Sequence, residues 1–392
     1  MYEAIIVGAR VAGAAVALLL ARKGHRVLLL DKYTEPGPVL SSHIIGEIDI
    51  YERLGISGRM DDSGIPPMTR MRVDLEGRIL ESDILVTPRS LCIRRELLDR
   101  WLLDEAVSHP LVTFRPRTKV IGPVMDKAGA VTGVNVENDA GRREVVHGRV
   151  VIGADGRQST LASALKPLTR FLSDEHHPGV YYGYLSGVAP LPIPAVEWYW
   201  SGRDIILCSP MDEGRHCIAL MTHDAIFRSG EGSLSERFMK RLGSIRTLAP
   251  RLKEAALSAQ VRGAAQLPSY VRQAYGPGWA LVGDAGAHLH PISGIGIDNA
   301  VCTAEMLAEE LHLYFQGEKT WLEAMTDYES RRDERIVPQY HACLKTLART
   351  EKSVAQEQLD TMDMLCTFPG LVRELATRGK DVYNILTEER SS

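Results

Sequence analysis

The chain has 392 residues, and its content of 45% hydrophobic and 24% charged residues is ordinary for a soluble globular protein. This length predicts two structural units, and the formal net charge of -4, without a basic tract, argues against a nucleic-acid partner. The six cysteines form no C-x-x-C pair, so we expect neither a metal site nor a disulfide framework. The apolar stretch 12–21 is about half as long as the ~20 residues that cross a bilayer. These features favour a cytoplasmic protein without a membrane span.

The N-terminal residues are predicted to form a strand, a helix and a second strand. An apolar run at 4–7 precedes a helical stretch at 12–22, and a second apolar run follows at 27–30. Two parallel strands require a crossover between them, usually a helix, so this order predicts a βαβ unit.

The first turn, residues 8–13, has the sequence Gly-Ala-Arg-Val-Ala-Gly. A dinucleotide-binding turn needs glycine where the backbone turns, where it approaches the pyrophosphate and where the helix packs on the strand. Gly8 and Gly13 match the first and third positions, whereas Arg10 replaces the second, where its charge could help to hold a phosphate. Asp31, at the end of the second strand, is placed to bind the ribose hydroxyls of an adenosine. A plain packing turn is the alternative.

A β-rich block interrupts the nucleotide-binding pattern. Between 179 and 220, β-branched and aromatic residues alternate with turn residues and prolines, which predicts an antiparallel sheet. Strands at 145–152 and 279–282 then run into glycine turns, and the sequence from 328 onward is mostly helical. We therefore expect an α/β fold with a discontinuous Rossmann-type cofactor domain, an inserted antiparallel substrate domain and a helical C-terminus. The expected bounds are 1–70, 90–165 and 275–340 for the cofactor domain, 71–89 and 166–274 for the substrate domain, and 341–392 for the C-terminal segment.

A second glycine-rich segment follows the late strand. Gly283-Asp284 ends this strand, and a loop with Pro291, Gly294 and Gly296 leads into a helix expected at about 299–315. The aspartate can bind the hydroxyls of a ribityl chain. Free N–H groups at the helix start can face the pyrimidine ring of a flavin, where negative charge collects on reduction. No common structural turn needs this whole string.

Two shorter motifs lie between these segments. One is Asp155-Gly156, which follows a strand, and the other is the pair Arg95 and Asp99 on a predicted helix. Asp-Gly turns and Arg–Asp helix pairs are common, so each is unspecific alone. Their order between the two glycine-rich segments makes them informative.

The four motifs together resemble the flavoprotein monooxygenase superfamily with a single Rossmann domain, typified by aromatic hydroxylases, over residues 1–340. Residues 41–45 and 275–279 are also similar to a branch of bacterial FAD-dependent oxidoreductases. The resemblance implies bound FAD and transient NAD(P)H, with Asp284 on the ribityl chain, the loop 291–296 on the isoalloxazine and Arg95 near the phosphates. It implies FAD contacts at Gly8, Arg10, Ala12, Gly13, Asp31, Lys32, Arg95, Asp155, Gly283, Asp284, Pro291, Gly294, Gly296 and Ile297.

The sequence departs from the family pattern at two further places. Asp298 stands where aromatic hydroxylases often carry an amide, and we expect its carboxylate to cap the following helix rather than face the flavin. The string Trp198-Tyr199-Trp200 resembles part of a flavin-dependent halogenase motif, but Ser201-Gly202-Arg203 follows it. Residues 73–117 also contain no lysine, which a halogenase would need there. Halogenation is therefore disfavoured.

The resemblance implies an NAD(P)H- and O2-dependent monooxygenase of a small apolar or aromatic substrate, in which FAD supplies the chemistry. The alternatives are a flavin-dependent reductase of carbon–carbon double bonds of the prenyl-lipid reductase type, a flavoprotein that uses FAD as a non-redox scaffold for cyclisation, and a flavin-binding regulator without turnover. A monomer and a homodimer are both compatible with the sequence.

The inserted sheet is expected to form the roof of the substrate pocket. Tyr182 and Tyr184, and likewise Trp198 and Trp200, are spaced to share one face of a strand, where they could bind the substrate or simply form the core of the sheet. His43 and His288 are the catalytic candidates, and a structural hydrogen-bonding role is the alternative for each.

Overall fold

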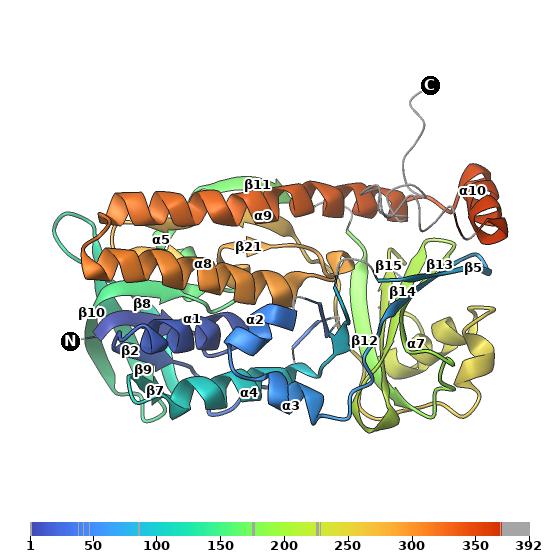
Figure 1. The fold of residues 1–392 in the computed structure, drawn as a ribbon, viewed down its shortest axis with the longest axis horizontal. Coiled ribbons are helices and arrows are strands. Elements are labelled where there is room, and N and C mark those ends of the chain that lie inside the picture. Colours follow the sequence, from blue (N-terminus) through green and yellow to red (C-terminus); the bar gives the residue numbers. More distant parts are fainter. Residues whose placement is uncertain are drawn as a thin grey trace.

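The computed structural model describes residues 2–37, 39–41, 43–46, 48–84, 87–174, 177–224, 227, 229–368 and 370. Ser42, within the segment 41–45 that supports the family resemblance, and most of the C-terminal segment after 368 lie outside these residues. The chain forms two eight-stranded sheets, one with a parallel core and one mostly antiparallel, with a long helix running across both (Figure 1). The expected mixed α/β fold with a helical C-terminus is confirmed.

The first sheet is built from strands that are distant in sequence. Its parallel order is β20, β10, β1, β2, β7, and the short β19 pairs antiparallel with β20 at one edge. Side chains of β1 alternate between the two faces, with Ala4 and Ile6 in one core and Ile5 and Val7 in the other. Both faces are therefore covered, as a parallel sheet requires. The strands are β1 (Tyr2–Val7), β2 (Val27–Leu30), β7 (Val112–Arg115), β10 (Arg143–Gly153), β19 (Tyr275–Gly276) and β20 (Trp279–Leu281).

Helices cover one face of this sheet and a β-meander covers the other. The apolar faces of α1 (Val11–Arg22), α4 (Arg95–Ser108) and α8 (Gly296–Gln316) share one core with the sheet. On the opposite face lie β9 (Val131–Asn138), which pairs with the first half of β10, β8 (Thr118–Met125), which pairs with β9, and α5 (Thr160–Leu165).

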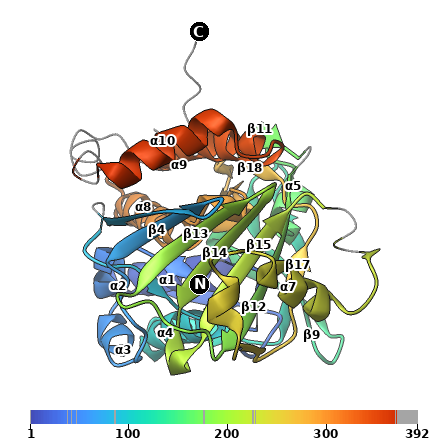
Figure 2. The ribbon, with the colours of Figure 1, turned by 90° about the vertical axis from the view of Figure 1, so that its right-hand side faces the viewer.

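The second sheet has the order β16, β12, β15, β14, β13, β4, β5, and β17 also pairs with β12 (Figure 2). Only β4 and β13 pair in parallel. Its outer face packs on α7 (Leu234–Gly243), whereas its inner face is turned toward the loops of the first sheet. The strands are β4 (Arg70–Leu75), β5 (Arg78–Asp83), β12 (Gly179–Ser186), β13 (Ala195–Ser201), β14 (Asp204–Pro210), β15 (His216–Thr222), β16 (Ala256–Leu257) and β17 (Arg262–Ala264).

Several smaller elements complete the fold. They include a three-stranded sheet and a two-stranded sheet, and short helices follow β3. These elements are β3 (Ile44–Ile45), α2 (Ile48–Arg53), α3 (Ser57–Asp61), β6 (Leu91–Cys92), β11 (Thr169–Ser173), β18 (Ser269–Arg272), β21 (Ala287–His288) and the 3-10 turns at Asp212–Gly214, Ala249–Leu252, Gly283–Ala285 and Pro291–Ser293.

The helix α9 (Trp321–Thr350) is continuous across residue 340, where we expected the C-terminal segment to begin. Its first half packs on α8, and Ile336, Tyr340 and Leu347 in its second half join the apolar cluster on the inner face of the second sheet. The helix α10 (Gln356–Thr367) then packs on β5. None of the described helices is long and apolar enough to cross a membrane. The domain boundaries remain an interpretation.

Candidate functional site

Four chain turns meet at one edge of the parallel sheet. Because β1, β2, β10 and β20 run in the same direction, the residues that follow them emerge together. Backbone hydrogen bonds extend the sheet into these turns: Gly8 N donates to Leu30 O at 2.8 Å, and Ala154 N donates to Val7 O at 2.8 Å. The carboxyl edge of such a sheet is where open α/β folds bind nucleotides.

The β1–α1 turn has no room for side chains at its two glycines. Gly8 has a φ of 100°, and a Cβ there would lie 2.6 Å from Ala154 O. A Cβ on Gly13 would lie 1.8 Å from Gly8 O, so α1 begins in direct contact with the strand that precedes it. The first N–H groups of α1 are thereby held at the sheet edge, where they suit a pyrophosphate.

A pocket lies beside this turn, over the ends of β2 and β7. Arg10, Asp31 and Phe114 contribute to its lining. The Asp31 carboxylate accepts hydrogen bonds from Ala9 N and Tyr33 N, at 2.8 and 2.9 Å, and is held at the mouth of the pocket. Arg10 makes no ion pair with any described residue, so its guanidinium is available to an anionic group.

Lys32 and Arg95 are two further residues that we expected to contact FAD. The exposed Lys32 stacks its ammonium group over the Tyr33 ring, 5.1 Å from the centroid. Arg95, in the first turn of α4, is held by an ion pair of 2.9 Å with Asp99, whose side chain is fully buried. The internal pair therefore fixes the direction of the Arg95 side chain.

Asp155 follows β10 and has one free oxygen. Its Oδ2 accepts a hydrogen bond from Thr160 N at 2.7 Å, whereas its buried Oδ1 has no partner among the described residues. Burial raises the pKa of this carboxyl above its ordinary value. A buried acceptor without a partner is costly, which suggests that a ligand hydroxyl or amide completes it.

Three side chains donate hydrogen bonds to backbone oxygens of residues 281–285. Tyr270 Oη donates to Asp284 O at 2.6 Å, Arg272 Nη1 donates to Ala285 O at 2.9 Å, and Tyr328 Oη donates to Leu281 O at 2.8 Å. Gly283, with a φ of 59°, lies against Ala12 of α1. The Asp284 carboxylate is bonded to no described residue and is free to bind ligand hydroxyls.

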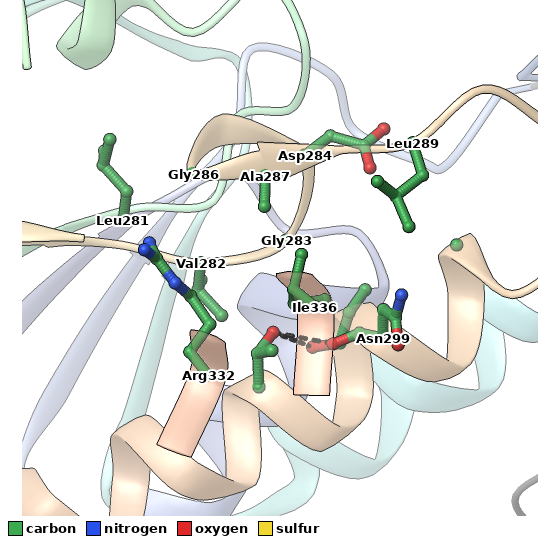
Figure 3. A pocket seen from close by; sticks show the side chains of 13 residues that line it. Leu281, Val282, Gly283, Asp284, Gly286, Ala287, Leu289, Asn299, Arg332 and Ile336 are labelled. Carbon is green, nitrogen blue, oxygen red and sulfur yellow. Dashed lines mark hydrogen bonds between the residues drawn. The ribbon is translucent and has the colours of Figure 1, made fainter. Parts of the chain in front are cut away.

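Behind this segment lies a narrow pocket between it and the helices α8 and α9 (Figure 3). Arg332 and Ile336 of α9 and Asn299 of α8 line it, and the Asp284 carboxylate points away from Arg332. Arg332 is 1% exposed and is paired with Asp333 at 2.7 Å. The helix α9 thus lines the pocket behind the aspartate segment.

The loop that leads into α8 is fixed by His290, which sequence analysis missed. Its Nδ1 accepts from Ile292 N at 3.2 Å, and its Nε2–H donates to Pro178 O at 3.1 Å, so the ring is neutral. Burial lowers the pKa of His290 to about 3. Pro291 begins the 3-10 turn, Gly294 ends it with a φ of 69°, and α8 starts at Gly296 with Ile297 buried in the core. The only sequence signal was a histidine before the proline.

His43 and Tyr184 come together from opposite sides of the site. His43, fully buried, donates from Nδ1–H to Ser41 O at 2.7 Å, and its Nε2 accepts from Tyr184 Oη at 2.7 Å. Burial raises the pKa of Tyr184 far above its ordinary value, which keeps the hydroxyl protonated. Cys217 Sγ lies 3.8 Å from His43 Nδ1, and a hydrogen bond from Cys92 lowers the pKa of its thiol. Sequence analysis did not single out this cysteine.

The other candidates lie in two places, on the inner face of the second sheet and in the short strand β21. Trp198 and Trp200 lie half-buried among apolar residues of the inner face, on the same side as Tyr182. His288 lies in β21 and is 5% exposed, and its Nδ1–H donates to Pro268 O at 2.5 Å. Burial lowers the pKa of His288, and these contacts favour the structural role for this residue.

Asp298 does not cap α8, contrary to our expectation. Its carboxylate accepts hydrogen bonds from Gly46 N and Tyr51 Oη, both at 2.8 Å, and Ile295 occupies the N-cap position without a side-chain bond. The helix starts three residues earlier than its expected range, which moves Asp298 into the first turn. Its role is to bind the segment after β3 to α8.

Comparison with known proteins identifies a family of flavin-binding proteins. A family described as an FAD binding domain matches residues 1–338. The chain belongs to this family. The predicted resemblance to the single-Rossmann flavoprotein superfamily is thus confirmed.

Individual relatives have different activities. The chain is 26% identical to digeranylgeranylglycerophospholipid reductase 2 of Methanothermobacter thermautotrophicus, covering 98% of this chain and 94% of the relative. Its fold matches the myxobacterial chondrochloren halogenase CndH with a TM-score of 0.80, 18% identity, and coverage of 94% and 90% of the two chains. It also matches PqsL, a probable FAD-dependent monooxygenase from Pseudomonas aeruginosa, with a TM-score of 0.69, 20% identity, and coverage of 89% and 97%. The protein is an FAD-dependent oxidoreductase.

The residues present suit FAD. The glycine turn that excludes any Cβ, the free carboxylate of Asp284 and the orphaned Oδ1 of Asp155 lie on turns that leave the same sheet edge. When bound, FAD would supply hydride and electron transfer. We assign its adenosine end to the pocket at Asp31 and its flavin end to the loop at Pro291.

Replacing Gly13 by alanine is expected to abolish FAD binding and to lower the free energy of unfolding by about 3 kcal/mol, because the new methyl group meets the backbone oxygen of Gly8. Gly58→Ala in α3 is the control, since nothing lies within 4 Å of a Cβ there. Flavin absorbance after purification and urea denaturation check both variants. A Gly13→Ala protein that retains FAD would contradict the assigned turn.

His290 predicts a loss of stability in acid. Its folded pKa of about 3 lies below the ordinary 6.5, so only the unfolded chain takes up this proton as the pH falls from 6.5. Its contribution is complete above pH 6.5 and decreases by about 1.5 kcal/mol between pH 6.5 and 5. Urea denaturation gives the free energy of unfolding at each pH. Plotted against pH over this range, its slope for the wild type and for His290→Gln should differ by the uptake of one proton. The exposed His147→Gln is the control, and equal slopes for wild type and His290→Gln would refute the prediction.

Proposed function

We propose that the protein is an NAD(P)H- and O2-dependent FAD monooxygenase that acts on a small apolar or aromatic substrate. The observation that carries this proposal is the aromatic inner face of the second sheet, which lies across from the loop assigned to the flavin. Tyr182, Tyr184 and the half-buried Trp198 occupy this face together with aliphatic side chains. A buried apolar wall excludes water and orients the substrate, and both are needed when a reduced cofactor reacts with O2 in preference to side reactions.

Two residues at the inner face of the second sheet, Tyr184 and His43, can also accept and release a proton. Tyr184 Oη already donates to His43 Nε2, and His43 is fixed in this tautomer by Ser41 O. A substrate group that approaches Tyr184 can therefore exchange a proton with the phenol while the imidazole takes or returns it. The similarity of the fold to that of PqsL, a probable FAD-dependent monooxygenase, supports this proposal.

A second candidate is a flavin-dependent reductase of carbon–carbon double bonds. It is favoured by the similarity to digeranylgeranylglycerophospholipid reductase 2, which extends over nearly the whole of both chains. Such a reaction adds a hydride from the cofactor and a proton from the protein, and a His43 protonated on both nitrogens would pass that proton on through the Tyr184 hydroxyl. The two candidates share the site and differ in whether oxygen enters the product.

Isotopic oxygen separates the two candidates. The FAD-loaded protein is first mixed anaerobically with NADH or NADPH, and we expect one of them to bleach the flavin band, which recovers in air. Turnover under 18O2 is then followed by mass spectrometry with 2-naphthol and, separately, with digeranylgeranylglycerophospholipid. We expect 18O in the naphthol product. Hydrogen added to the prenyl lipid, without 18O in any product, would instead establish the reductase.

A further inference from the structure

Two cysteines from distant parts of the chain meet at the inner face of the second sheet. Cys92 lies in β6 and Cys217 lies in β15, and both belong to the same buried cluster, with exposed fractions of 0% and 2%. Their thiols are hydrogen-bonded to each other. The proposed function uses neither sulfur, so this contact requires a separate explanation.

Strand pairing holds both sulfurs close to His43. Cys217 stands opposite Tyr184 in the pair of β12 and β15. Cys92 stands opposite Ile44, which follows His43 in the chain, in the pair of β3 and β6. The Sγ of Cys217 lies 3.8 Å from His43 Nδ1, and His43 Nε2 is bonded to Tyr184. The two thiols, the imidazole and the phenol therefore form one polar group within an apolar cluster.

Cys217 differs in its ionisation from the other buried cysteines. Hydrogen bonds from Cys92 and from His43 lower the pKa of Cys217 to about 5, although burial acts in the opposite direction. Burial raises the pKa of Cys208 and of Cys343, and the bond to Cys217 together with burial raises that of Cys92. The thiolate is the nucleophilic form of cysteine. The pair thus contains one nucleophile and, in contact with it, one thiol that can form a disulfide with it.

We propose that Cys92 and Cys217 are a redox-active pair, which hydrogen peroxide converts into a disulfide. The Cys217 thiolate attacks one peroxide oxygen, the O–O bond breaks, and the released hydroxide takes a proton from solvent and leaves as water. Cys217 is then a sulfenic acid. The sulfur of Cys92 attacks the sulfur of this group, the S–S bond forms and the S–O bond breaks. The departing hydroxide takes the proton of the Cys92 thiol and leaves as a second water. The two sulfurs together lose two electrons, which the peroxide gains.

The fold allows the two sulfurs to approach each other. The sheet of β3 and β6 has only two strands, and its ladder is two residue pairs long. A strand held by so few bonds can shift toward β15, which is fixed on both sides by β12 and β14. The disulfide would join the segment that leads into α4 to the second sheet. It would therefore cross-link the two layers of the fold beside the pair of His43 and Tyr184.

The first test counts thiols. The exposed Cys366 is replaced by serine so that it cannot react, which leaves five of the six cysteines. The FAD-loaded Cys366→Ser protein is treated with hydrogen peroxide, unfolded and alkylated with N-ethylmaleimide. Its intact mass should show a fall from five reactive thiols to three, and a digest should contain a peptide pair that joins Cys92 to Cys217. Five remaining thiols, or a disulfide between other cysteines, would overturn the proposal.

The second test identifies the sulfur that reacts with the peroxide. In Cys92→Ser no thiol can close the disulfide, so dimedone should trap a sulfenic acid on Cys217. In Cys217→Ser we expect Cys92 to stay unlabelled. Cys208→Ser is the matched control, because Cys208 is buried on the outer face of the same sheet, and the disulfide should still form in this variant. A labelled Cys92 in Cys217→Ser, or an unlabelled Cys217 in Cys92→Ser, would overturn the assigned roles.

Flavin absorbance shows whether each variant retains its cofactor and hence its fold around the site. If a serine variant loses FAD, the corresponding alanine variant takes its place in the same measurements. The peroxide is supplied from outside, so this inference goes beyond the proposed function and does not rest on it. Failure to form the disulfide leaves the proposed reaction intact, and failure to incorporate 18O into a product leaves the redox-active pair intact.

Discussion

The contact between the start of α1 and the turn after β1 determines where the rest of the site is placed. Because neither Gly8 nor Gly13 leaves space for a Cβ, the helix approaches the strand closely enough to hold its free N–H groups at the sheet edge. Gly283 lies against Ala12 of the same helix, so the aspartate segment takes its position from this contact. Sheet order then places Asp31 and Asp155 on the turns to either side.

The sequence predicted the parts of this arrangement that are local. The glycine spacing of residues 8–13, the strand that ends at Asp31 and the strand that ends at Gly283-Asp284 each carry their own signal in consecutive residues. The start of α8 was placed three residues late, because the loop glycines masked the first helical turn. For the same reason Asp298 was assigned to a cap that Ile295 occupies.

The contacts that depend on distant parts of the chain could not be predicted. His43 and Tyr184 were proposed for different roles, and only the packing of the second sheet on the loop after β2 brings them within 2.7 Å. His290 looked like one more histidine in a glycine-rich loop. Its ring is fixed by Pro178, which lies 112 residues away in the sequence, and no local pattern reports this contact.

The uninterrupted course of α9 has a consequence for how a substrate can enter. At about 45 Å, this one helix touches α8 in its first half and the inner face of the second sheet in its second half, and Pro338 lies near the junction of the two halves. Because a proline inside a helix removes one backbone hydrogen bond, a hinge between the two layers would have to bend the helix at Pro338 or detach one of its halves from a buried apolar contact. Any relative motion of the two layers is therefore limited to a bend at this residue, and the short loops around the wall are the other route by which a substrate can enter.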